Sequence, residues 1–410
     1  MVLQKGKNIH IRENKAEEIC QQINTEQRNT EQENSAEKNP LKRKIIKKLW
    51  FLLIYPLCII IMAAVKKSSY IAEEIFAKRI FKVFSQIMSL ISGIFPFSVA
   101  ELCIVSGPAL LTVLFIYWVV RVFKRGKKKR LIGYLNGFVN ILIGLGIALF
   151  VFIIGCGVNY YRYPVNYYLG FEVREYTTDE LFSLCSELAV RAGEARSRLN
   201  DHENEDGVFE LNISMGELGK YAKEAYSKVS EEYAIFGGFY AKPKAVHFSR
   251  VLSSMEITGI FIPFTMEANV NIDIPDYSIG STMCHELAHL HGFIREDEAN
   301  YISYFICTNS GNEILNYSGL MEALIIAGNA LYAQDKDKYY EVRALYDDGV
   351  VRDLYANSLY WKEFEDTPIS NAAQKVNDTY LKANNQEDGV KSYGRMVDLL
   401  LAEYVNRQNN

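Results

Sequence analysis

Long apolar runs separated by short basic segments dominate the first part of the chain. Apolar uncharged residues fill 49–65 and 102–120, and a stretch of 31 uncharged residues covers 131–161. A helix needs about 20 apolar residues to cross a bilayer, and basic residues lie beside the runs. The pattern predicts three transmembrane helices, at about 49–65, 102–120 and 134–158.

The segment 70–95, between the first two runs, has apolar and charged residues at helical spacing. Such an amphipathic helix is typical of a segment that lies along a membrane surface. Lys and Arg concentrate at 42–48 and 124–130, which hold five and six of them. Because basic flanks face the cytoplasm, we expect a cytoplasmic N terminus and an outer location for residues from about 165 onward.

Charge and polarity divide the chain into three regions. Residues 1–44 are polar and rich in Glu, Gln and Asn, which predicts a disordered tail; the membrane region follows at 45–164, and a separate domain at 165–410. Residues 1–158 hold 23 Lys and Arg against 10 Asp and Glu, whereas 159–410 hold 22 against 39. The basic residues flank apolar runs and do not alternate with aromatic ones, so nucleic acid is excluded as a partner.

The spacing of apolar residues changes twice along the domain at 165–410. Helical spacing at 177–199 and 216–234 gives way to short alternating β-branched segments, and helical spacing returns after 279. The predicted fold class is α+β, a mostly helical domain with a small antiparallel sheet. The expected strands lie within three segments, 244–249, 255–264 and 266–274.

The sequence His-Glu-Leu-Ala-His at 285–289 carries the candidate chemistry. Residues four apart lie on one helix face, so His285 and His289 present two imidazoles to one ion. Glu286 can reach a water in the open position of a tetrahedral zinc site and act as its base. Gly292 is expected to end this helix in the left-handed conformation. The motif predicts one Zn²⁺ per chain and a catalytic role for Glu286.

A third zinc ligand is expected from the following helix, which begins with the three carboxylates Glu296, Asp297 and Glu298. Spacing alone does not choose among them. The run Glu298-Ala299-Asn300 resembles the Glu-Ala-Asp or Glu-Ala-Asn signature of gluzincin-type metallopeptidases, in which the glutamate binds the metal. The resemblance implies Glu298 as the third ligand and Asn300 as a hydrogen-bonding support for a histidine ligand.

An edge strand beside the active-site helix pairs with the substrate backbone in HExxH peptidases. The alternating stretch just before the helix is predicted to be this strand. Its residues are Glu267, Ala268, Asn269 and Val270.

Three polar residues near the C terminus are candidates for stabilising an oxyanion. The alternative interpretation is a turn that packs the last helix on the core. The residues are Tyr380, Tyr393 and Arg395.

Four separated motifs resemble one family, the DUF3810 family of bacterial membrane proteins with an HExxH motif. The likeness runs from about residue 45 to the end, and it implies three membrane segments followed by a minigluzincin-like domain. It also implies the metal and catalytic roles given above to His285, Glu286, His289 and Glu298, but names no substrate. The motifs are PFSVAEL at 96–102, GVNYYRYPV at 157–165, HELAHLHGFIREDEANYISY at 285–304 and NDTYLKANNQEDGVKSYGRMVDLL at 377–400.

The leading hypothesis is a multi-pass protein of the bacterial cytoplasmic membrane whose outer domain is a zinc metallopeptidase. Its partners would be the lipid bilayer and a peptide or protein substrate from the membrane or the cell envelope. The alternative is a non-catalytic zinc-containing domain that binds, senses or scaffolds an envelope partner. Glu286 favours the first, since a structural zinc site has no use for a general base. Inverted topology would instead place a regulator-cleaving protease in the cytoplasm.

Overall fold

A computed structural model describes residues 25, 40–124, 127–384 and 395–409. Most of the predicted tail at 1–44 lies outside the described residues. The chain divides into two compact units, which are treated separately. Unit 1 comprises Met1–Tyr55 and Thr112–Ile147, and unit 2 comprises Pro56–Leu111 and Ala148–Asn410.

Helices of membrane-spanning length form over all three predicted apolar runs. Lys44–Lys67, Val99–Phe123 and Arg130–Gly155 are each long and apolar enough to cross a bilayer. The chain therefore has several helices of the kind found in membrane proteins. In this first part of the chain the elements are α2 (Pro40–Leu49), η1 (Trp50–Leu53), α3 (Ile54–Lys67), η2 (Ile71–Phe81), α4 (Lys82–Gly93), α5 (Val99–Phe123), α6 (Lys127–Gly155) and η3 (Gly157–Tyr161).

One further helix, α13 (Glu313–Gln334), meets the same criteria of length and hydropathy, but 61% of its apolar window is buried inside the protein. It packs against α8 (Thr178–Ser197), α11 (Asp276–Leu290) and α12 (Glu296–Asn309). Burial against three neighbouring helices explains why α13 is apolar around its whole circumference.

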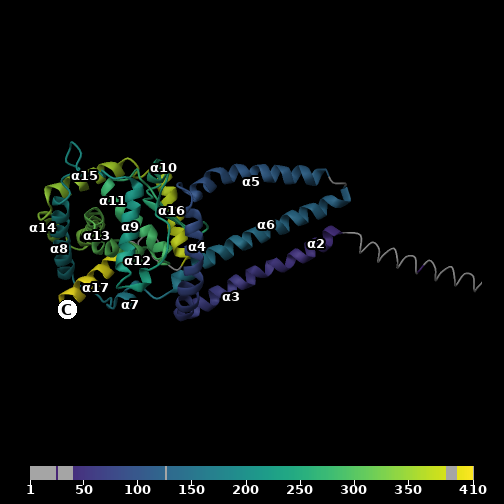
Figure 1. Cartoon of the computed structure of the whole chain (residues 1–410), viewed down its shortest axis with the longest axis horizontal. Coiled ribbons are helices and arrows are strands. Elements are labelled where there is room, and N and C mark those ends of the chain that lie inside the picture. Colours follow the sequence, from purple (N-terminus) through teal and green to yellow (C-terminus); the bar gives the residue numbers. More distant parts are fainter. Residues whose placement is uncertain (1–24, 26–39, 125–126, 385–394, 410) are drawn as a thin grey trace, which may run out of the picture. The chain divides into compact units, whose positions relative to one another are not determined.

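Unit 2 contains the predicted mostly helical domain. Figure 1 shows α11, α12 and α13 in its interior, with α8 and the short α14 on the side far from α4. Some helices begin at a side-chain cap; at the start of α8, Thr177 and Glu180 form a reciprocal capping box. The remaining elements are α7 (Val165–Leu169), α9 (Met215–Val229), η4 (Ala234–Phe236), α10 (Ser249–Ser254), α14 (Lys336–Arg343), α15 (Asp348–Lys362), α16 (Pro368–Ala383) and α17 (Met396–Asn409).

The small sheet has three strands, within the three predicted segments, but its topology differs from the prediction. The strands β1 (Lys244–Ala245), β2 (Gly259–Ile262) and β3 (Glu267–Val270) lie in the order β1-β3-β2. β3 pairs parallel to β1 and antiparallel to β2, so the sheet is mixed and not antiparallel.

The prediction that Glu267, Ala268, Asn269 and Val270 form an edge strand is therefore wrong. These four residues are buried, and strands pair with both sides of β3. Glu267 has a structural task instead, because its carboxylate accepts hydrogen bonds from the backbone amides of Val99 and Ala100 and pairs with Lys244. A carboxylate at these amides stabilises the N-terminal end of α5.

A buried polar network joins three helices of unit 2. The Asp353 carboxylate on α15 accepts hydrogen bonds from Arg196 Nε on α8 at 2.8 Å and from the Phe209 amide at 2.7 Å. The Tyr317 hydroxyl of α13 donates to the same carboxylate. Arg196 and Asp353 are both excluded from solvent.

We expect Asp353→Ala to lower the free energy of unfolding by about 3–5 kcal/mol, because it leaves the Arg196 charge buried without its main partner. Thermal and denaturant unfolding of the full chain in detergent measures this loss. Glu224→Ala, which breaks an exposed pair with Lys220, should change the stability by less than about 0.5 kcal/mol. Equal effects of the two substitutions would contradict this assignment.

Candidate metal centre

The HExxH segment forms the last turns of α11, as predicted. His285 and His289 lie one turn apart, with ring centroids 4.7 Å from each other. The helix ends at Leu290, and Gly292 then adopts φ +87°, the left-handed conformation expected of a helix-terminating glycine. Four residues later α12 begins with Glu296. The sharp turn brings the start of α12 back to the histidines.

Glu296 is the carboxylate that meets both histidines. Its Oε2 lies 3.1 Å from His285 Nε2 and 3.7 Å from His289 Nε2. The ligand atoms of these three residues all lie within 4.8 Å of one another, and among the described residues no other such group of His, Cys, Asp and Glu side chains occurs.

The geometry of this cluster fits a tetrahedral zinc ion. Ligand atoms at about 2.0–2.2 Å from zinc lie about 3.3–3.5 Å from one another, and the two distances to Glu296 lie on either side of that range. His289 Nδ1 faces the Phe293 carbonyl oxygen at 2.8 Å, which favours a proton on Nδ1 and leaves the Nε2 lone pair directed at the cluster. Two imidazoles and one carboxylate form a donor set typical of catalytic zinc.

Glu286 lies beside the cluster without a partner of its own. It is 3% exposed, and its Oε2 atom makes no hydrogen bond in the described structure. Burial raises its pKa to about 8. A buried carboxylate oxygen without a hydrogen-bond donor lowers the stability of the fold. The same oxygen is free to accept a proton from a water molecule, as a general base must.

The two histidines differ in charge state because their surroundings differ. Burial alone would lower the pKa of His285, but the hydrogen bond to Glu296 and the nearby carboxylates outweigh burial and raise it to about 9. Burial lowers the pKa of His289 to about 4. At neutral pH the cluster without metal therefore holds one imidazolium and one neutral imidazole.

Glu298 does not lie in the cluster, so the prediction of Glu298 as the third ligand is wrong in this structure. One of its oxygens accepts a hydrogen bond from the Val165 amide at 2.8 Å, and the carboxylate pairs with Arg295. Residues two apart on a helix point to different faces, so Glu296 and Glu298 cannot both turn toward α11. Glu298 instead joins the start of α12 to the start of α7.

The predicted supporting residue Asn300 is buried on α12, and no hydrogen bond from its side chain to a histidine is found in the described part of the chain. The Phe293 carbonyl orients His289 in its place. Tyr393 lies outside the described residues. Arg395 lies 3.6 Å from Asp297 and is partly exposed, which agrees with the alternative interpretation that this stretch packs the last helix.

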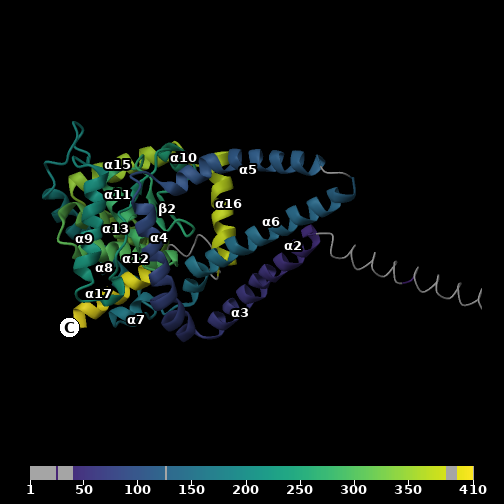
Figure 2. The same cartoon turned by 45° about the vertical axis from the view of Figure 1, so that its right-hand side comes forward.

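Tyr380 is the oxyanion candidate that lies near the cluster. Its hydroxyl lies 3.5 Å from Cys156 Sγ; burial raises its pKa, and the Glu296 charge adds to this rise. The Tyr380 ring contacts Phe152 edge to face. Figure 2 shows α16, which carries Tyr380, at the margin of unit 2.

A small apolar cover lies over the cluster. Cys156, Tyr160 and Ile294 are buried together, with Phe152 and Phe261 packed against them. The Phe261 ring is 5.8 Å from that of His289. The cover therefore joins the end of α6, the loop before α12 and strand β2 above the candidate metal centre.

Strand β2, not β3, borders the open side of the site. Among the described residues β3 is its only neighbouring strand. The Asn271 amide donates to the Thr258 carbonyl, and alternate residues of an antiparallel pair bond to the partner strand. Gly259 and Phe261 therefore direct their backbone groups away from β3. A Cβ on Gly259 would lie 2.4 Å from Glu286 Oε1, so only glycine allows this close approach.

Sequence reasoning missed one further carboxylate. Glu322 of α13 lies near His285, contributes to the rise in its pKa and accepts a hydrogen bond from the Ser303 hydroxyl. It is the one charged residue in the apolar interior of α13, between Glu313 and the C-terminal end of the helix. An isolated acid in an apolar helix is the signal that identifies such a residue.

Fold and cluster together define a class: a protein with helices of membrane-spanning length and a helical domain whose histidine–glutamate cluster suits a divalent metal. The family that matches residues 76–401 is described as "Protein of unknown function (DUF3810)". The match covers most of the chain, and the chain belongs to this family. No curated protein and no solved structure matches the chain.

We expect Glu296→Gln and His285→Ala to abolish zinc binding, whereas Glu298→Gln should keep about one zinc per chain. Glu298 contacts Arg295 and the Val165 amide instead of the histidines. Metal analysis by inductively coupled plasma mass spectrometry after dialysis measures the zinc content. Loss of zinc from Glu298→Gln, with zinc retained by Glu296→Gln, would restore the assignment predicted from sequence.

Zinc affinity should continue to rise between pH 7 and pH 9. Below about pH 9 His285 is protonated in the metal-free protein. Because zinc must displace this proton, the zinc affinity rises by up to about tenfold per pH unit. Competition with a chelator at several pH values measures the affinity. An ordinary histidine, with a pKa of about 6.5, would give a plateau above pH 7, and a plateau there would contradict the raised pKa.

Proposed function

We propose that the protein is a membrane-anchored, zinc-dependent metallopeptidase. His285, His289 and Glu296 hold one zinc ion, and Glu286 is the general base. The observation that carries the proposal is the convergence of His285, His289 and Glu296, next to a buried Glu286 that has an unpartnered oxygen. A purely structural zinc site needs a fourth protein ligand and no such base.

When bound, zinc would polarise the substrate carbonyl and make an attacking water more acidic. Glu286 accepts the proton of that water and passes it to the leaving amine. Its pKa of about 8 in the metal-free protein makes the protonated form stable enough to deliver the proton. His289 is kept in position by the Phe293 carbonyl, and Tyr380 is the hydroxyl placed to stabilise the negative charge that develops on the carbonyl oxygen.

An extended peptide is the substrate that the sheet accommodates. The outward backbone groups of Gly259 and Phe261 offer an edge to which a strand can add. Gly259 also brings this edge directly against Glu286. A substrate paired with β2 therefore passes its backbone beside the base, with recognition depending on the main chain more than on side chains.

The membrane topology completes the proposal. With three crossings by the helices over 44–67, 99–123 and 130–155, the distribution of Lys and Arg favours an N terminus inside and residues from about 165 onward outside the bacterial cytoplasmic membrane. The substrate would then be a membrane or cell-envelope protein. The last turn of α6 carries Phe152 and Cys156 to the cover of the metal centre, which favours substrates close to the bilayer.

The cover also supports a second candidate function, a non-catalytic zinc-containing domain that binds or senses an envelope partner. Cys156, Tyr160 and Ile294 are each at most 3% exposed, so the cover is packed closed in this conformation. Catalysis needs the cover to open, whereas a sensing domain does not.

We expect Glu286→Gln to retain zinc and lose cleavage activity by about 10²- to 10⁴-fold, the usual contribution of a general base. Membranes from cells lacking the protein are incubated with the purified full chain, and new peptide termini are identified by mass spectrometry. Glu231→Gln, at an exposed position, is the control. Identical termini with the wild type and with Glu286→Gln, or none with the wild type, would favour the non-catalytic candidate.

A further inference from the structure

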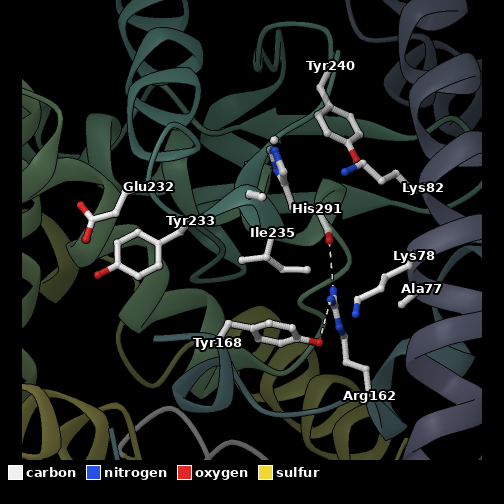
Figure 3. A pocket seen from close by; sticks show the side chains of 12 residues that line it. Ala77, Lys78, Lys82, Arg162, Tyr168, Glu232, Tyr233, Ile235, Tyr240 and His291 are labelled. Atoms are coloured by element: carbon white, nitrogen blue, oxygen red, sulfur yellow. Dashed lines mark hydrogen bonds between the residues drawn. The ribbon is translucent and has the colours of Figure 1, made fainter. Parts of the chain in front are cut away.

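A second cavity lies in unit 2, between the η2–α4 helical segment and the chain at 232–240. It has a volume of about 500 Å³ and is lined by none of the proposed zinc ligands. Figure 3 shows its side chains converging from these two sides. The lining residues are Ala77, Lys78, Lys82, Arg162, Tyr168, Glu232, Tyr233, Ala234, Ile235, Gly237, Tyr240 and His291.

Two lysines one helical turn apart supply positive charge to this cavity. Figure 3 shows Lys78 and Lys82 directed into it from the same helical segment. Lys78 is paired with Glu74, but no hydrogen bond or ion pair of the Lys82 ammonium group is found within the described residues. Tyr240 adds a hydroxyl group to the cavity, 3.5 Å from Ser85 Oγ.

The other charged groups of the cavity do not offset the charge of Lys82. Arg162 is neutralised by Glu73, with two hydrogen bonds of 3.0 and 3.1 Å. His291 Nδ1 lies 2.7 Å from the Leu287 carbonyl oxygen, and its ring stacks on that of Tyr226. The carboxylate of Glu232 lies on the far side of the cavity from both lysines (Figure 3). The side lined by Lys78 and Lys82 therefore favours an anion.

The same helical segment has an apolar outer face. Its inner face carries small and polar residues that contact the domain, among them Ala77, Ser85 and Ser89, and Ser89 accepts a hydrogen bond from the Ala241 amide. Large aliphatic side chains exposed in a row are unfavourable in water and indicate an apolar partner. The outer residues are Ile75, Ile80, Val83, Ile87, Leu90, Ile91 and Ile94, each at least 41% exposed.

The position of the segment in the chain identifies this partner. The segment follows directly on the helix that ends at Lys67 and precedes the helix that begins at Val99, and both helices are of membrane-spanning length. Its outer face is therefore held at the bilayer boundary, where lysines extend their ammonium groups to the phosphate layer. A cavity beside that face, with two lysines at its rim, lies at the level of lipid headgroups.

We propose that this cavity binds the phosphate-bearing headgroup of an anionic phospholipid, with Lys82 and Lys78 contacting the phosphate and Tyr240 donating to it. The acyl chains lie along the aliphatic face of η2–α4. The site fixes unit 2 against the leaflet, and it does not depend on the zinc chemistry, because its lining contains none of the proposed zinc ligands.

The experiment compares lipid retention by the full chain from nanodiscs of phosphatidylglycerol and of phosphatidylcholine, read by native mass spectrometry. The wild type should retain one more phosphatidylglycerol than the double variant Lys78→Gln/Lys82→Gln. Each lysine should change the lipid affinity by about fivefold, since a basic residue near an anionic surface contributes about 1 kcal/mol. Tyr240→Phe should weaken retention without removing charge.

Lys220→Gln is the matched control, because Lys220 also pairs with a glutamate one turn away but lies on the exposed face of α9. It should retain lipid as the wild type does. Unchanged thermal stability and zinc content of the double variant exclude misfolding. Equal retention by the wild type and the double variant, equal retention of the two lipids, or displacement of the lipid by millimolar inorganic phosphate would each overturn the proposal, the last by indicating a free-phosphate site.

Discussion

The site in unit 2 depends on the way a buried helix accommodates ionisable side chains. Helix α11 is enclosed by α12, α13 and the sheet, and it carries His285, Glu286 and His289 into that interior. Burial disfavours the charged form of each of them, and the pKa of Glu286 rises while that of His289 falls. Glu296 compensates for this only in part, since it can neutralise one imidazolium. A divalent cation among these donors would satisfy both histidine nitrogens and Glu296 at once, which explains why such a polar group is tolerated inside an apolar core.

Short-range rules were sufficient to predict the helices and the arrangement of the two histidines of the HExxH motif. The i, i+4 spacing of His285 and His289 and the stop at Gly292 depend only on helix geometry, and the structure shows both. Residue spacing did not identify which carboxylate lies next to the histidines. The choice between Glu296 and Glu298 depends on the angle at which α12 leaves the turn. That angle is fixed by contacts distant in sequence, among them the Val165 amide that binds Glu298. A likeness to a short signature could not supply this information.

The sheet shows the same limit in another form. The alternation of apolar residues predicted the segments that contain all three strands. It does not predict the order of the strands in the sheet. β1 is two residues long, and this short strand pairs with the free side of β3 and turns an expected edge into the centre of the sheet. Of the two edge strands, β2 is the one in close contact with α11, and this contact requires glycine at 259. In a similar way, the sequence pattern predicted that the segment 70–95 is amphipathic. It did not predict that the face with serine and alanine residues contacts the domain.

The cover over the metal centre sets the energetic condition under which the proposed enzyme acts. Cys156 Sγ lies 3.5 Å from the Tyr380 hydroxyl oxygen. The rings of Phe152 and Tyr380 pack edge to face, with their centroids 6.4 Å apart. Contacts of these two kinds add to the burial of Cys156, Tyr160 and Ile294 in holding the cover closed. Phe261 belongs both to the cover and to β2. In the proposed enzyme, a peptide that paired with this strand would therefore meet the cover at Phe261, whose ring lies 5.8 Å from that of His289.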